Sequence, residues 1–240
     1  MKERLDRAYC GQPMNLAADR VFADVIERFS IPREVPEALL EGLAWDVEGR
    51  RYETLAELYA YAARVAGTVG AMMALLMGVH SAEGLARACD LGVAMQLSNI
   101  ARDVGEDARM GRLYLPRDWM IEAGLDPDAW LAQPTFSPAL ARVVRRVRDA
   151  AEALYARVDA GVARLPLACR PGINAARFMY AEIGREVARR GLDSVGARAR
   201  VSAARKAWLL MRAAVLLAPS AAARALPPLR ANRFLVDAAV

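Results

Sequence analysis

The chain has 240 residues, of which 55% are hydrophobic and 25% charged, and its formal net charge is +5. Three widely spaced cysteines and a single histidine, His80, argue against a disulfide framework and leave almost no material for a histidine zinc site or a Ser-His-Asp triad. The positive charge suits an anionic partner, but no block of aromatic residues interleaved with Lys and Arg is typical of a nucleic-acid-binding module, and nucleic acid is not an expected partner.

Apolar residues recur at helical spacing through nearly the whole chain, whereas alternating runs of β-branched residues are scarce. Prolines break this pattern, because a proline disfavours helix in the residue before it. The pattern predicts helices at 17–29, 33–45, 54–78, 82–109, 117–123, 137–164, 170–191 and 200–217. No repeat or composition shift marks a linker, so we expect one all-α domain over residues 1–240.

Two apolar stretches are similar to membrane segments in composition. Residues 59–79 carry only one charge, at Arg64, and approach the ~20 residues that a spanning helix needs. Their many glycines and alanines favour a buried helix of a bundle. Residues 207–218 are too short to span and fit either a terminal core helix or a helix resting on an acidic membrane surface. Their basic flank is formed by Arg198, Arg200, Arg205 and Lys206.

The N-terminus begins with charged residues and shows no secretory signal. We therefore expect a cytoplasmic protein, and the basic charge together with residues 198–218 offers a surface for peripheral contact with the inner face of the cytoplasmic membrane.

Polar residues form a stripe on the predicted 82–109 helix. Asn99, Asp103 and Asp107 are spaced four and four, with Gln96 three residues before them, so they stack along one face over about 12 Å. Two carboxylates at this spacing repel each other, unless a cation lies between them. Oxygen ligands favour Mg²⁺ or Mn²⁺.

Arginines are interleaved with this stripe at Arg102, Arg109 and Arg112. A guanidinium group binds phosphate oxygens bidentately, so the segment predicts a metal-bridged diphosphate site. The alternative is a solvated helix end on which the acids only pair with neighbouring arginines.

Three stretches carry a resemblance to a known family. They are QLSNIARDVGEDARMGRLYLP at 96–116, WDVEGRRYETLAELYAYAARVAGTVGAMM at 45–73 and RFMYAEIGREV at 177–187. With them the sequence resembles the squalene/phytoene synthase family, most closely its bacterial phytoene-forming members, over about residues 1–215.

The resemblance implies an all-α isoprenoid-synthase bundle with a central cavity. It implies a Mg²⁺-dependent prenyltransferase that condenses two geranylgeranyl diphosphates head-to-head, through a cyclopropyl diphosphate, to phytoene in carotenoid biosynthesis. Other enzymes of that pathway are then expected partners. The alternatives are a synthase of the squalene or dehydrosqualene type that uses farnesyl diphosphate, and a non-catalytic assembly protein on the same fold.

The resemblance also implies roles for individual residues. Metal ligands are expected at Asn99, Asp103 and Asp107, the two aspartates being catalytic, and substrate contacts at Gln96 and Arg102. The same match implies catalytic tyrosines near the reacting carbons at Tyr61 and Tyr180, small substrate-binding residues of the cavity wall at Gly67 and Gly70, and a late diphosphate-binding arginine at Arg200. Without the resemblance, the tyrosines fit core or rim positions and the glycines fit helix packing.

One departure from the family pattern stands out. The family has two aspartate-rich motifs on facing helices, and the first would lie upstream of Met1. The acidic sets Asp19/Asp24, Asp46/Glu48 and Glu53/Glu57 do not fit it, and Glu53/Glu57 is explained by the preference for acids at a helix start. We therefore expect an N-terminally incomplete bundle that lacks its first helices.

Overall fold

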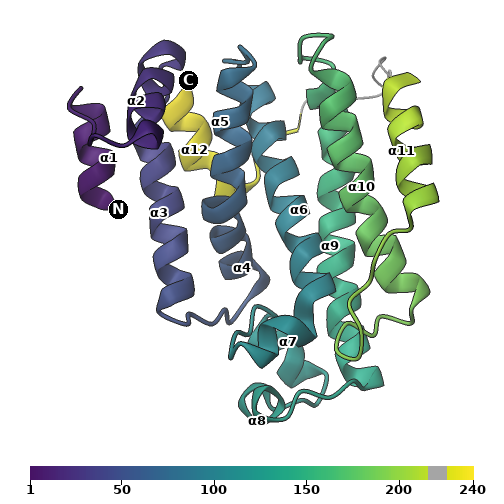
Figure 1. The fold of residues 1–240 in the computed structure, drawn as a ribbon. Helices are drawn as coiled ribbons and strands as arrows, with labels where there is room; N and C mark the ends of the chain where they lie inside the picture. Colours follow the sequence, from purple (N-terminus) through teal and green to yellow (C-terminus); the bar gives the residue numbers. More distant parts are fainter. Residues whose placement is uncertain (216–225) are drawn as a thin grey trace.

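The structure is a computed structural model and describes residues 1–215 and 226–240. Within these residues it contains helices and turns but no strand, which confirms the all-α prediction (Figure 1). The elements are α1 (Lys2–Tyr9), α2 (Ala17–Phe29), α3 (Glu34–Val47), α4 (Leu55–Ala62), the π-helical turn η1 (Ala63–Gly67), α5 (Thr68–Leu76), α6 (Ala82–Arg109), α7 (Arg117–Glu122), α8 (Pro127–Ala132), α9 (Pro138–Val162), α10 (Arg170–Arg189), α11 (Ala203–Val215), the 3-10 turn η2 (Arg230–Asn232) and α12 (Arg233–Ala239).

The long predicted helices are confirmed, and the sequence pattern missed the short helices α1, α8 and α12. The predicted 54–78 helix is divided by the π-helical turn η1, and the last residues of the predicted 200–217 helix lie outside the described part. Side-chain caps fix several helix starts. Thr54 accepts a hydrogen bond from the backbone N–H of Glu57, and the Glu57 carboxylate accepts one from the N–H of Glu53, so Thr54 and Glu57 cap the start of α4.

Helix α6 lies at the centre of the bundle. Figure 1 shows α3, the α4–α5 segment, α6, α10 and α11 running side by side, with α7 and α8 at one end. Two glycines bring the α4–α5 segment onto α6. A Cβ atom at Gly70 would lie 2.2 Å from the carbonyl oxygen of Ala88, and one at Gly92 would lie 2.1 Å from that of Ala66. The two backbones therefore touch, which no larger residue would allow.

The segment Leu55–Leu76 is the one described segment long and apolar enough to cross a membrane by length and composition, and half of it is buried. Here it packs on α6 and forms a wall of the bundle. Its apolar character is thus accounted for by contacts inside the fold, as the glycines and alanines of the sequence suggest.

The C-terminal segment folds back against α6. Asp90, which is fully buried, accepts hydrogen bonds from Asn232 Nδ2 at 2.9 Å and Arg157 Nε at 2.8 Å, and Arg87 Nη2 lies 3.2 Å away. Both arginines also donate to the carbonyl oxygen of Pro227. These contacts hold α12 beside α3, α5 and α6 (Figure 1).

Candidate functional site

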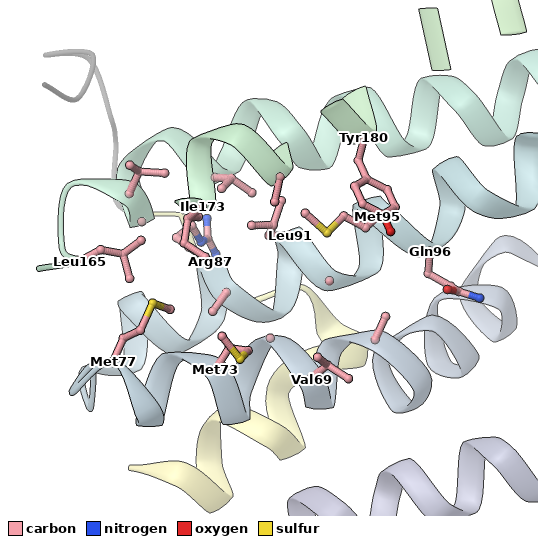
Figure 2. A pocket seen from close by; sticks show the side chains of 18 of the residues that line it. Val69, Met73, Met77, Arg87, Leu91, Met95, Gln96, Leu165, Ile173 and Tyr180 are labelled. Carbon is pink, nitrogen blue, oxygen red and sulfur yellow. The ribbon is translucent and has the colours of Figure 1, made fainter. Parts of the chain in front are cut away.

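An apolar cavity of about 350 Å³ lies between the α4–α5 segment, α6, α9 and α10. Figure 2 shows its length: Met77 and Leu165 lie at one end, and Gln96 and Tyr180 at the other. Val69 lines the cavity and remains 44% exposed, so the cavity opens to the surface along α5. Such a space suits an extended hydrocarbon chain.

One face of α6 supplies more of the lining residues than any other element. They recur at helical spacing and, apart from Arg87, they are apolar or small until the polar end is reached. They are Gly84, Arg87, Ala88, Leu91, Gly92, Met95, Gln96 and Asn99. The predicted amides Gln96 and Asn99 are therefore both at the cavity, at the end where the carboxylates of α6 follow.

Asp103 lies one turn beyond Asn99 on α6 and is enclosed by two arginines. Arg102 donates from Nε at 2.7 Å and from Nη2 at 2.5 Å. Arg198 donates from Nε at 2.8 Å and from Nη2 at 3.2 Å. Asp103 is thus ion-paired in this structure with one arginine of its own helix and one from the segment between α10 and α11.

Asp107 is different, because no ion pair joins it to another described residue. Burial raises its pKa to about 7, with a further contribution from the negative charge of Asp103, while Arg112 acts in the opposite direction. A divalent cation beside this carboxylate would remove the penalty on its charged form.

The donor set fits magnesium. Asn99, Asp103 and Asp107 offer oxygen atoms on one face of α6, and no described group of three or more His, Cys, Asp or Glu side chains forms a metal site by itself. Magnesium is commonly held by one or two carboxylates together with phosphate oxygens of a substrate. The face is therefore suited to a cation that a diphosphate helps to bind.

Of the two tyrosines and two glycines predicted at the site, one of each kind lines the cavity and the other does not. Tyr180 lines the cavity beside Gln96 (Figure 2), and Gly70 lines it as well. Gly67 is not among the lining residues, since a Cβ there would face Asn232 Oδ1 at 3.2 Å and Leu235 at 3.3 Å. The absence of a side chain at Gly67 leaves room for the C-terminal segment to pack there.

Tyr61 also lies away from the cavity lining and is only 2% exposed. Its hydroxyl donates to Asp46 at 2.9 Å, and Tyr114 donates to the same carboxylate at 2.7 Å. The Tyr61 ring belongs to a three-ring cluster, with its centroid 5.1 Å from that of Tyr52 and 5.2 Å from that of Tyr114, which lie 6.3 Å from each other. Burial and the neighbouring acceptors raise the pKa of Tyr61, so it is a hydrogen-bond donor rather than a base.

The sequence did not predict that Asp46 and Tyr114 meet in one cluster. Both stand inside the stretches that carried the resemblance, Asp46 in WDVEGRRY and Tyr114 in GRLYLP. The signal was present, but nothing in the spacing of residues 68 positions apart indicates that they meet.

Arg198, two residues before the predicted Arg200, reaches Asp103, and both arginine side chains are exposed. The role of Arg200 in diphosphate binding stays a prediction. The segment 190–202 approaches α6 closely: the N–H of Gly105 donates to the carbonyl oxygen of Ser194 at 2.9 Å. A Cβ at Gly105 would lie 2.6 Å from the carbonyl oxygen of Val195.

The fold is shared with solved structures of isoprenoid-forming enzymes. A crystal structure of a dehydrosqualene synthase in complex with ligand superimposes with a TM-score of 0.82 at 29% identity, over 90% of this chain and 76% of that one. The squalene synthase of Alicyclobacillus acidocaldarius has the same fold, with a TM-score of 0.74 at 23% identity over 79% and 72% of the two chains. These likenesses define an all-helical synthase bundle.

Within that class, the model of the family described as squalene/phytoene synthase matches residues 1–206. The chain belongs to the squalene/phytoene synthase family.

Its relatives include two curated phytoene synthases. That of Rhodobacter capsulatus is 54% identical over 227 residues, which are 95% of this chain and 66% of the relative. That of Cereibacter sphaeroides is 57% identical over 210 residues, which are 87% and 59% of the two chains. The chain thus spans somewhat less than two thirds of the length of these relatives.

Proposed function

We propose that this chain forms the cavity and one metal-binding face of a phytoene synthase, a prenyltransferase that joins two geranylgeranyl diphosphates head-to-head through a cyclopropyl diphosphate. The observation that carries the proposal is the continuity of α6, on which an apolar cavity wall passes into Gln96, Asn99, Asp103 and Asp107. A hydrocarbon tail and a diphosphate head need these two environments next to each other.

The residues present support separate parts of this chemistry. Asn99, Asp103 and Asp107 would hold Mg²⁺, which supplies charge neutralisation for the leaving diphosphate. Arg102 supplies a guanidinium for phosphate oxygens. Tyr180, at the polar end of the cavity, offers an aromatic face beside which a cation is stabilised. The apolar wall keeps water from the reacting carbons.

The C20 substrate is favoured over the C15 alternative by the phytoene synthases at 54% and 57% identity. The dehydrosqualene synthase is more distant, at 29% identity. Labelled geranylgeranyl and farnesyl thiodiphosphates, each dialysed against the chain with Mg²⁺, test the choice by binding. The proposal expects the C20 compound to bind more tightly than the C15 compound, and Asn99→Ala to weaken the binding of both. Tighter binding of the C15 compound would overturn it.

We further propose a cytoplasmic protein in peripheral contact with the inner face of the cytoplasmic membrane, through α11, in the company of other carotenoid-forming enzymes. The outer side of α11 exposes Trp208, Leu210, Met211 and Val215. Guanidinium groups of Arg205 and Arg212 lie 4.5 and 5.7 Å from the Trp208 ring. Apolar side chains flanked by cations suit an anionic lipid surface. Residues 216–218 of the predicted surface lie outside the described residues.

Apolar side chains test this surface better than its charges do, because Arg198 and Arg205 also pair with Asp103 and Glu182. Trp208→Ser combined with Met211→Ser should lower co-sedimentation with vesicles containing anionic lipid, whereas Ile121→Ser, at an exposed site on α7, should not. Equal co-sedimentation of both variants and the unchanged chain would contradict the membrane proposal.

A further inference from the structure

Asp103 carries an ion-pair arrangement that a metal ion would have to change. Its carboxylate is 15% exposed and both oxygens accept from guanidinium groups, those of Arg102 on one side and Arg198 on the other. A divalent cation that uses Asp103 as a ligand needs at least one of these oxygens. One arginine must therefore move when the cation binds.

The two arginines differ in how easily they can leave. Arg102 lies next to Asp103 on α6 and its side chain is 16% exposed. The Arg198 side chain is 40% exposed and comes from the segment between α10 and α11, with Glu106 as a weaker second partner at 3.5 Å. Partly exposed pairs contribute little and are screened by solvent. Arg198 is the partner that a cation displaces more readily.

The segment that carries Arg198 has other anchors. Ser194 accepts from Gly105 on α6, the side chain of Asp193 accepts from the N–H groups of Val195 and Gly196 at 2.9 Å each, and Ala199 is buried. Loss of the Asp103 pair would leave the segment in place. The released guanidinium would stay close to the face of α6.

We infer that Arg198 is a displaceable counter-ion of the metal-binding face: it pairs with Asp103 while no cation is bound, and it turns to the diphosphate oxygens when a cation takes its place. The inference rests on the proposed function, since it needs a cation and a diphosphate at this face. The charges balance in both states, because the carboxylate exchanges a guanidinium for a metal ion and the freed guanidinium gains an anionic partner that it can bind bidentately.

The test measures binding rather than turnover. Free Mn²⁺ is followed by electron paramagnetic resonance while the whole chain is titrated without diphosphate. Retention of labelled inorganic diphosphate is then measured by equilibrium dialysis at saturating Mn²⁺. Arg198→Gln should bind Mn²⁺ about two- to fivefold more tightly than the unchanged chain, because no ion pair has to be broken. The same variant should retain diphosphate at least about threefold more weakly, since one charge-assisted contact is gone.

Lys206→Gln is the matched control, because it removes one positive charge from an exposed side chain at the start of the neighbouring helix α11. It should shift neither measurement. Arg198→Lys serves as a second variant: it keeps the charge but loses the bidentate fork, and it should gain less Mn²⁺ affinity than Arg198→Gln. Circular dichroism melting verifies that each variant is folded.

The outcomes separate the inference from the proposed function. Equal Mn²⁺ affinity of the unchanged chain and Arg198→Gln, or an equal gain in Lys206→Gln, overturns the displacement and leaves the proposed function standing. Absence of Mn²⁺ binding in every variant, with diphosphate present or not, overturns both. Opposite shifts of Mn²⁺ and diphosphate binding in Arg198→Gln alone support the inference.

Discussion

Asn232 donates a hydrogen bond from Nδ2 to Oδ1 of Asp90 at 2.9 Å, across 142 residues of sequence. The bond joins the C-terminal segment to the middle of the helix that lines the cavity. Asp90 also forms ion pairs with Arg87 and Arg157. A single buried carboxylate therefore holds two guanidinium groups and the C-terminal segment together.

Asp90→Leu should therefore be strongly destabilising. It leaves two arginines without their carboxylate, and breaking a buried pair costs about 3–5 kcal/mol of the free energy of unfolding. Urea denaturation followed by circular dichroism measures the loss. Glu122→Gln, which removes the partner of Arg146 at an exposed pair, should cost no more than about 1 kcal/mol. Similar losses in the two variants would show that the Asp90 cluster is not a structural anchor.

Gly92→Ala should open the contact between α6 and η1. Its Cβ would lie 2.1 Å from the carbonyl oxygen of Ala66, and because backbone cannot step aside as a side chain can, we expect a loss of at least about 2 kcal/mol in unfolding free energy. Gly172→Ala, on α10, meets no atom within 4 Å and should be neutral or stabilising by up to about 1 kcal/mol. An equally stable Gly92→Ala protein would contradict the backbone contact.

Ala176→Phe should fill part of the cavity. Ala176 lines it from α10, so a phenyl ring there would compete with a prenyl tail for the same space. We expect binding of geranylgeranyl thiodiphosphate, measured by calorimetry, to weaken at least about tenfold, an energy typical of losing two buried methylene contacts. Ala156→Phe, at an exposed position of α9, should bind normally. If both variants bind alike, the tail does not occupy this cavity.

The junction of α10 and α11 should weaken in acid. Burial alone would raise the pKa of the fully buried Glu182, but hydrogen bonds and charges from Arg205 and Arg189 outweigh it, and the pKa lies below its usual value. The stabilisation is therefore fully present above the unfolded pKa of about 4.3 and is lost as the pH falls through the folded pKa. The melting temperature of the unchanged chain should exceed that of Glu182→Gln at pH 6, and the two should converge toward pH 3. A constant difference across this range would contradict the assignment.

Helical periodicity was sufficient to predict the architecture. The 82–109 helix was predicted with the bounds that the structure has, because Ser81 caps its start and its apolar spacing is unbroken. The 3.6-residue period also placed Gln96 and Asn99 on the face that lines the cavity. Short helices such as α12 carry too few residues for a period to stand out, and they form because of tertiary contacts.

Contacts between distant segments could not be predicted in the same way. Asp46 receives Tyr61 and Tyr114 from two other elements, and Gly67 faces Asn232 instead of the cavity. Each depends on the packing of whole helices, which local spacing does not encode. The pairing of Arg198 with Asp103 was not predicted for the same reason, since the path of segment 190–202 decides which side chain reaches α6.

The central claim is that a cation on the α6 face joins a diphosphate head to a tail in the cavity. Calorimetric titration of the unchanged chain with geranylgeranyl thiodiphosphate, with and without Mg²⁺, tests it most directly against the double variant Asp103→Asn with Asp107→Asn. The account predicts Mg²⁺-dependent binding that weakens by at least about a hundredfold in the double variant, whose amides keep the shape but not the charge. Binding of equal strength in both proteins, or binding that ignores Mg²⁺, would contradict it.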